Sequence, residues 1–400
     1  MLRRVVALVA MMLTVYPTYA QLDESVLIGG DTLTYRYIPV DQTHVGRYTP
    51  NVESGRSILD YLTFGDSELN PGVSFTILGA PFYNEERGWG LTFGGDMRYR
   101  TPRMTEADSP STLRLRLSAS LKGSYDVEVD GRNNLGGNRH RVSYAVTYAS
   151  QPTYVWGLSF DEARGGDRGR YVANICHVEG GYGYRVMQSL EVGARLEYLG
   201  FSASKLSERG AEVLQGEVGA LSMVGVGVDI VYDTRRAEGY STRGLNVAAT
   251  YTLRSYPFDH IPMGHNATLR LDYYQPLWRG ATLLFDLFGE YNSSNTPWML
   301  RATMGGGTVM RGYYEGRYMG DNLISAQAEL SQHIWQGLGV AAWGGAGVLF
   351  SKDDPFEWRK VLPTYGIGLR WGVGGGASLS IDVAFGKGSQ TVIAGFSKGL

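Results

Sequence analysis

The sequence has little cysteine, little charge and no excess of either sign of charge. Its 400 residues include one Cys, and 19% are charged, with 37 Lys and Arg against 39 Asp and Glu. A single Cys excludes an internal disulfide and a zinc cluster built from cysteines. The near-neutral balance argues against a nucleic-acid-binding protein, which needs a basic surface. With 43% hydrophobic and 12% aromatic residues, the chain is also too apolar to be disordered.

Beyond the N-terminus, the sequence lacks an apolar run that could span a bilayer as a helix. The best candidate, 334–351, carries no formal charge but is interrupted by Gln336 and several glycines. A spanning helix needs about 20 predominantly apolar residues. We therefore expect this stretch to form a strand, a tight turn and a second strand.

The N-terminus has the layout of a secretory signal peptide. Arg3 and Arg4 precede an apolar stretch over 5–15, and Thr18 and Ala20 then place small residues at the two positions that a signal peptidase reads. We predict a signal peptide over 1–20, with a membrane anchor as the alternative. The apolar stretch is not followed by a Cys, which argues against a bacterial lipoprotein. The mature chain is therefore expected to work outside the cytoplasm.

What the sequence does contain is strict alternation of apolar and polar residues, in segment after segment. Alternation with a period of two places one set of side chains on each face of a strand. One face carries Leu, Val, Ala and Tyr, and the other repeatedly carries full charges. Clear examples are 91–99, 113–121, 125–130, 190–198, 269–274 and 324–331.

This pattern predicts an all-β protein, a transmembrane antiparallel up-and-down β-barrel. Such a barrel needs apolar residues toward lipid, a polar lumen and strands of about 9–11 residues. We predict about 16 strands between residues 72 and 400. The preceding segment, 21–71, is polar and interrupted by prolines. We interpret it as a short periplasmic extension or a segment tucked into the lumen, and the sequence does not choose between them.

Loop lengths support the barrel independently. Outer-membrane barrels have short periplasmic turns and longer outer loops, and short and long connections largely take turns here. Two connections break the rule, because 101–110 is long where a short turn is expected and 122–123 is tight where an outer loop is expected. Long connections are predicted at 151–170, 204–221, 255–265, 295–321 and 352–364, and short ones at 136–137, 187–189, 278–280, 336–337 and 374–377.

Three segments resemble the BamA/TamA-type outer-membrane barrels, also called the bacterial surface antigen family. Asp233-Thr234-Arg235 followed by Ser241-Thr242-Arg243-Gly244 resembles the family's strand–turn–strand motif, with Ser in place of its Pro. Met310-Arg311-Gly312-Tyr313 resembles the signature of its long outer loop, with Met in place of Val. Residues 321–330 resemble the strand that follows that loop. Two departures are that 21–71 has no room for a periplasmic POTRA domain and that the chain ends in Leu400, where many such barrels have an aromatic residue.

The resemblance implies a role for the loop arginine. In the family this arginine reaches into the lumen and pairs with acidic residues of the barrel wall. By resemblance it is Arg311, within the signature Arg311-Gly312-Tyr313, and our candidate partners are Glu329 and Asp382. A guanidinium in a partly dehydrated lumen favours carboxylate partners. The alternative is that Arg311 is a solvated charge of an outer loop.

The resemblance also implies a weak seam between the first and last strands. The seam residues we single out are Phe75 and Phe82 on one side and Val392 and Phe396 on the other. The predicted function is assistance in inserting or translocating proteins or lipids at the outer membrane of a Gram-negative bacterium. A passive pore or a structural barrel is the alternative.

The expected partners are outer-membrane lipids and lipopolysaccharide, client outer-membrane or surface proteins and a periplasmic partner, with the barrel itself monomeric. The six histidines show no metal-ligand spacing, so we predict no metal, no cofactor and no enzyme. A hydrolase that uses Asp259 and His260 in an outer loop is the minor hypothesis.

Overall fold

The computed structural model describes residues 67–70, 73–84, 86–100, 110–235, 243–306, 309–335, 337–374 and 377–398. The predicted signal peptide over 1–20 and most of the predicted extension over 21–71 lie outside these residues. Among the described residues, the helices are all too short or too polar to cross a membrane.

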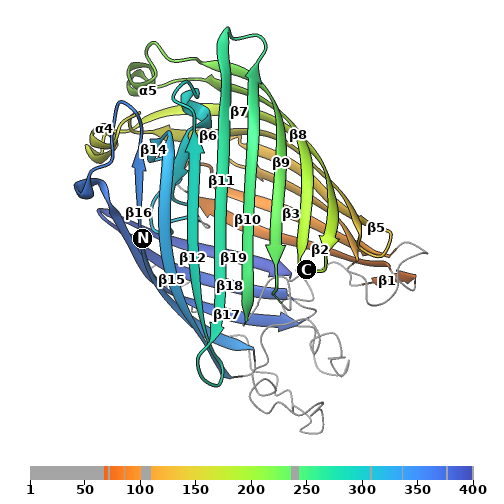
Figure 1. Cartoon of the computed structure of the whole chain (residues 1–400). Helices are drawn as coiled ribbons and strands as arrows, with labels where there is room; N and C mark the ends of the chain where they lie inside the picture. The colour runs from red at the N-terminus through yellow and green to blue at the C-terminus, as the bar shows by residue number, and fades with distance from the viewer. Residues whose placement is uncertain are drawn as a thin grey trace.

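The described residues form an antiparallel sheet of seventeen strands, curved into the barrel seen in Figure 1. One strand, β1, has only four residues, which leaves sixteen long ones, as the sequence predicts. A separate two-stranded sheet, made of β13 (Ala302–Met304) and β14 (Tyr318–Gly320), lies in the longest loop. The barrel strands are β2 (Val73–Asn84), β3 (Gly88–Tyr99), β4 (Ser111–Ser120), β5 (Tyr125–Leu135), β6 (His140–Val155), β7 (Gly169–Met187), β8 (Leu190–Ser204), β9 (Ala220–Asp233), β10 (Gly244–Tyr256), β11 (Ile261–Pro276), β12 (Ala281–Asn292), β15 (Asn322–Trp335), β16 (Leu338–Phe350), β17 (Leu362–Gly374), β18 (Ala377–Gly386) and β19 (Ser389–Lys398).

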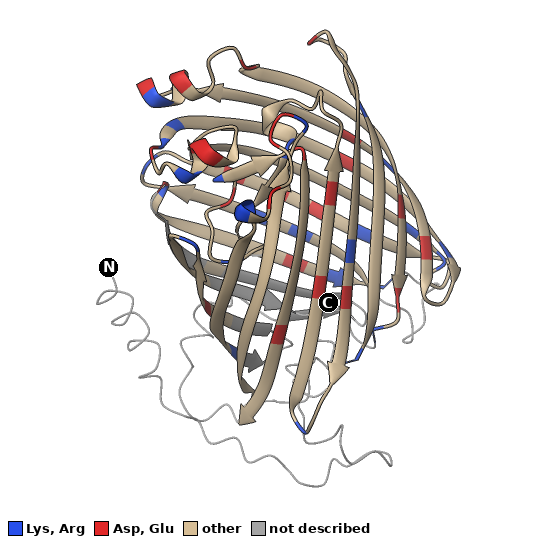
Figure 2. Cartoon of the chain, turned by 60° about the vertical axis from the view of Figure 1, so that its left-hand side comes forward, with Lys and Arg blue, Asp and Glu red and all other residues tan. Residues whose placement is uncertain are grey.

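The two faces of the sheet follow the alternation of the sequence. Large apolar side chains of the outward face remain exposed, as Leu196 (62%) and Ile367 (65%) show. The inward face carries charges that pair across strands, such as Arg114 with Asp130 at 2.7 Å. Figure 2 shows these charges as separate blue and red bands along the strands. An apolar exterior and a charged interior are what a barrel in a bilayer requires.

The two ends of the barrel differ as predicted, with one correction. The long connections 156–168, 205–219, 293–321 and 351–361 gather at one end, where short helices α4 (Phe160–Arg164) and α5 (Glu208–Val213) also lie. The predicted long loop at 255–265 is wrong. Strands β10 and β11 continue pairing up to Tyr256 and Ile261, which leaves a turn over 257–260. Pro257 and Pro262 suggest a loop, but Pro262 lies near the start of a strand, where it is tolerated.

Two further connections, 122–123 and 101–110, were expected to break the alternation of short and long loops. The tight connection at 122–123 is a turn between β4 and β5. The predicted long connection at 101–110 lies outside the described residues, apart from its last position.

The seam region has an additional strand. Strand β1 (Ser67–Asn70) pairs antiparallel with Val73 to Phe75 of β2, whereas β3 pairs along the whole of β2. Because a strand has two edges, β1 lies on the edge of β2 that a closed barrel would offer to β19. Among the described residues, no residue-by-residue register joins β2 to β19.

The hydrophobic core lies at the long-loop end and not in the middle of the barrel. Its largest cluster joins two connections, 156–168 and 293–321, with the ends of β15, β16 and β17. The core therefore packs the loop over 293–321 against the connection 156–168 at this end of the barrel. The buried members are Trp156, Phe160, Ala163, Ala302, Met304, Met310, Tyr313, Tyr318, Leu323, Leu349 and Leu362.

Candidate functional site: a loop pinned inside the barrel mouth

The loop over 293–321, between β12 and β15, folds into the barrel mouth. It contains the helical turn η1 (Trp298–Leu300) and the strands β13 (Ala302–Met304) and β14 (Tyr318–Gly320). Gly305 adopts a φ of +118°, and a Cβ there would lie 2.6 Å from the backbone of Tyr314. Only glycine fits such a position. The glycine lets the two arms of the loop pack closely, which directs Met310 and its neighbours into the core.

Arg311 reaches from this loop to the barrel wall. Its Nη2 lies 2.5 Å from Oε2 of Glu329 on β15, and its Nη1 lies 3.1 Å from Oδ2 of Asp382 on β18. The three side chains are 14%, 14% and 8% exposed. The structure therefore brings together the arginine and the two carboxylates that the sequence analysis singles out. Charge-assisted hydrogen bonds at such distances are among the strongest in proteins.

A second arginine, Arg370 on β17, shares the same carboxylates. Its Nη1 bonds Oδ1 of Asp382, and its Nη2 lies 3.5 Å from Oε1 of Glu329. Gly368 makes room for this contact, because a Cβ there would lie within 2 Å of the Asp382 carboxylate. Sequence reasoning missed Arg370. Its alternation with apolar neighbours places it in the lumen, but its partner depends on the strand register.

Trp343 on β16 completes the pocket around the guanidinium. The Cζ of Arg311 lies 3.8 Å from the centre of the Trp343 ring, and Trp343 is 5% exposed. A desolvated cation over an indole face gains about 2 kcal/mol. The hydroxyl of Thr364 donates a hydrogen bond to the carbonyl oxygen of Arg311. Both the side chain and the backbone of Arg311 are thus fixed.

Gly312 and Tyr313 dock the loop onto β18. Gly312 has a φ of +109°, and a Cβ there would lie 2.8 Å from the backbone of Phe385. The Tyr313 hydroxyl donates to the carbonyl of Pro363 at 2.6 Å and accepts from the backbone N–H of Lys387 at 2.8 Å. Tyr313 is 1% exposed. The three residues of the signature therefore contact β15, β16, β17 and β18 and the turn that follows β18.

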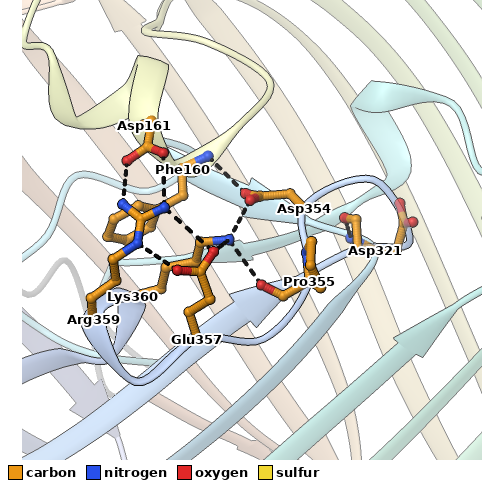
Figure 3. A network of polar contacts seen from close by, with 9 residues as sticks. Phe160, Asp161, Asp321, Asp354, Pro355, Glu357, Arg359 and Lys360 are labelled. Atoms are coloured by element: carbon orange, nitrogen blue, oxygen red, sulfur yellow. Dashed lines mark hydrogen bonds and ion pairs between the residues drawn. The ribbon is translucent and has the colours of Figure 1, made fainter.

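A clasp of charges covers the loop from outside. Arg359, in the connection between β16 and β17, binds both carboxylate oxygens of Asp161 on α4 at 3.0 and 3.2 Å (Figure 3). Beside it, Lys360 is 1% exposed and bonds Asp354, Glu357 and the carbonyl of Pro355. Phe160, next to Asp161, packs on Tyr318 of the loop with ring centres 5.5 Å apart. The clasp thus holds α4 against the loop.

The carboxylates of the clasp have lowered pKa values, so they remain ionised in more acidic solution than usual. Hydrogen bonds from Arg359 and Lys360 lower the pKa of Glu357 to about 2. The hydrogen bond from Arg359 likewise lowers the pKa of Asp161. The clasp was not predicted from the sequence, because Asp161 and Arg359 lie far apart in the chain and neither belongs to a motif.

The strand–turn motif lies at the opposite end of the barrel. Arg235 Nη2 pairs with Asp233 at 2.8 Å. Gly244 has a φ of +129° and lies against the backbone of Arg235, and Arg243 is exposed. The motif therefore shapes the turn between β9 and β10 and does not contact Arg311.

The seam residues are described in part. Phe82 is half-buried, and its ring lies where a Cβ on Gly90 would be. Val392 is 48% exposed. The side chains of Phe75 and Phe396 lie outside the described residues.

One described group has the composition of a metal site. His177, Glu179 and Glu197 place their ligand atoms within 4.8 Å of one another. However, Arg195 lies 3.8 Å from Glu179, and Arg254 lies 3.8 Å from Glu197. These cations neutralise the carboxylates, so ion pairing across the wall accounts for the group.

The candidate hydrolase pair is part of a turn. Asp259 accepts a hydrogen bond from the backbone of Ser222 at 3.0 Å. His260 is exposed and has a φ of +52°.

We compared the sequence and the structure with those of known proteins. No protein-family model and no curated protein matches the sequence. Among solved structures, the chain is similar to BamA from Haemophilus ducreyi lacking POTRA domains 1-3, with a TM-score of 0.56 and 13% identity over 82% of this chain and 71% of that one. It is also similar to CdiB from Escherichia coli (TM-score 0.57, 13% identity, 82% and 62% covered) and CdiB from Acinetobacter baumannii (0.54, 14%, 82% and 59%).

These likenesses define the fold. The protein is an all-β, antiparallel up-and-down barrel of the transmembrane type, with the architecture shared by BamA and CdiB. The chain spans less than two thirds of the length of the two CdiB chains.

Proposed function

We propose that this protein is an outer-membrane barrel of the BamA/TamA type that helps to insert or translocate proteins or lipids. The observation that carries the proposal is the position of Arg311, which pins a long loop to Glu329 and Asp382. The fold, shared with BamA and CdiB, supports it. A loop that served only to cap a structural barrel would not need a cation in a partly dehydrated lumen, where an unpaired charge is costly.

The barrel has the parts that such a function needs. The loop is docked inside the long-loop end of the barrel by Arg311 and Tyr313. The edge of β2 beyond Phe75 is free of β1, and an unpaired strand edge can accept an incoming strand through main-chain hydrogen bonds. A client strand could therefore leave or enter through the seam while the loop stays docked.

The partners follow from the same surfaces. The exposed apolar exterior suits membrane lipids and lipopolysaccharide, and the seam edge suits client proteins of β-structure. We propose that a periplasmic partner delivers those clients. We propose no catalytic step for this protein.

Depletion of the protein in its native bacterium tests the proposal. We expect a quantitative outer-membrane proteome and lipid profile to show the loss of several other barrels, or of one defined surface client. An unchanged profile would contradict the proposal and favour a passive pore or a structural barrel. Strong conductance that Arg311→Ala leaves unchanged would support the pore.

A further inference from the structure

Two exposed aromatic side chains project from the connection 351–361, which joins β16 to β17. Phe356 is 45% exposed and Trp358 is 83% exposed. Their rings pack edge to face, with centres 5.3 Å apart. Removing such rings from water is favourable. The pair is therefore an apolar surface that gains free energy from an apolar partner.

The pair continues the lipid-facing exterior of the barrel. Phe356 packs edge to face on Phe350, the last residue of β16, with ring centres 6.4 Å apart. Phe350 faces outward, because successive residues of a strand face opposite sides and Leu349 is buried in the core. Phe350 pairs with Asn322 of β15, which pairs in turn with Tyr291 of β12, 53% exposed. Rings of the outer wall thus lead directly into the connection.

The fold of the connection keeps the indole on the outside. Residues Trp358–Lys360 form the helical turn η2, in which the side chain of Lys360 is buried among Asp354 and Glu357. The backbone N–H groups of Lys360 and Val361 donate to the carbonyls of Glu357 and Trp358 at 3.0 and 3.2 Å. The contacts that bury the lysine therefore also fix the tryptophan in its exposed position.

We propose that Phe356 and Trp358 form an aromatic anchor that inserts into the outer leaflet of the membrane beside β16. A tryptophan suits this depth, because its ring is apolar and its N–H stays near the polar headgroups. Two aromatic side chains bury about 150–250 Å² each, well below the area of about 800 Å² per partner in a stable protein interface. Lipid, in contrast, already adjoins the pair along the outer wall. The anchor goes beyond the proposed function, since it requires only a barrel in a bilayer and holds equally for a passive pore.

The anchor binds through apolar contact and not through charge. The connection carries three cations and three anions, which are Lys352, Arg359, Lys360, Asp353, Asp354 and Glu357. Its net charge is therefore zero, and Arg359 and Lys360 already pair with carboxylates. Such a segment has no net field that would attract an anionic headgroup. Insertion should accordingly be insensitive to salt, which screens exposed charges.

Fluorescence quenching by brominated lipid tests the anchor in the full chain. The native protein and Trp358→Phe are reconstituted in liposomes of phosphatidylethanolamine and phosphatidylglycerol, with either ordinary or brominated acyl chains. The difference between the two proteins gives the emission of Trp358. We expect brominated chains to remove most of this emission, at low and high salt alike, because bromine quenches an indole that it contacts. Trp358→Phe keeps a ring beside Phe356, and heat-modifiable migration confirms that the barrel is folded.

Phe258 supplies a matched control. It is 76% exposed and lies at the tip of the β10–β11 hairpin, which Figure 1 shows projecting beyond the other strands. Adding Phe258→Trp to Trp358→Phe restores the number of tryptophans and places the indole in water, so bromination should not change its emission. Emission of Trp358 that brominated chains leave unchanged, or quench only at low salt, would overturn the anchor and leave the pair to a protein partner. A failed anchor leaves the proposed function standing, and depletion that alters no client leaves the anchor standing.

Discussion

Arg311 and Arg370 hold the same two carboxylates from different elements, one from the loop and one from the wall of the barrel. Glu329 and Asp382 therefore have a partner that moves with the loop and one that does not. If the loop leaves, Arg370 still neutralises part of the exposed charge. This lowers the cost of undocking below that of breaking an isolated buried pair, which is about 3–5 kcal/mol. The arrangement suits a loop that is held firmly and can still be released.

Replacing Arg311 should free the loop without unfolding the barrel. We expect Arg311→Ala to weaken loop docking by about 3 kcal/mol, because Glu329 and Asp382 lose one of two cations and Trp343 loses its contact. Limited proteolysis of intact cells should then cut within 305–317, whereas heat-modifiable migration of the folded barrel should be retained. Arg311→Lys should restore part of the protection, since an ammonium keeps the charge but not the fork of donors. Equal protection in all three proteins would contradict the pinned loop.

Gly368→Ala should mimic the loss of Arg311. The added methyl group would clash with both groups, lying within 2 Å of the Asp382 carboxylate and 2.5 Å from Nη1 of Arg370, so Asp382 must move from its partners. The control is Gly344→Ala on the adjacent strand, where a Cβ would lie 3.9 Å from its nearest neighbour. We expect faster proteolysis of the loop in Gly368→Ala only. A similar rate for both variants would show that the carboxylate position does not matter.

Gly312→Ala separates steric contact from backbone strain. Gly312 and Gly316 both have positive φ, at +109° and +80°. A Cβ at 312 would lie 2.8 Å from Phe385, whereas one at 316 would meet nothing within 4 Å. Gly316→Ala should therefore cost about 1 kcal/mol of backbone strain, and Gly312→Ala clearly more, measured as the midpoint of loop protection in urea. Equal midpoints would mean that the loop does not lie against β18.

The clasp should resist acid. The pKa of Glu357 is lowered from 4.5 to about 2, so its stabilising contribution is fully present above pH 4.5 and is lost as the pH falls toward 2. A carboxyl NMR titration should find a midpoint near 2 in the native protein. In Arg359→Ala the midpoint should move toward 4.5, because the hydrogen bond that contributes most is gone. A midpoint near 4.5 in the native protein would show that the clasp is not formed.

The fold could be predicted because the pattern that specifies it, the alternation of apolar and polar residues, lies within each strand. Alternation assigns each strand residue to lipid or lumen, and it needs no knowledge of which strands are neighbours. The predicted long connection at 255–265 was wrong, because β10 and β11 stay paired up to Tyr256 and Ile261 and leave only a turn over 257–260.

The site could be predicted only where a motif marked it. Arg311 belongs to a recognisable signature, and Glu329 and Asp382 have the right face. Arg370 and the pair Asp161–Arg359 depend on strand register and on contacts between distant loops. These contacts are set by the packed structure and leave no periodic trace in the sequence.

The most direct test of the account is client insertion by the purified protein in liposomes of outer-membrane lipids. An unfolded barrel client, identified by the depletion experiment, is added, and its folded fraction is followed by heat-modifiable migration. The account predicts faster insertion with the native protein than with empty liposomes, and a rate altered by Arg311→Ala. A rate equal to that of empty liposomes for both proteins would contradict it.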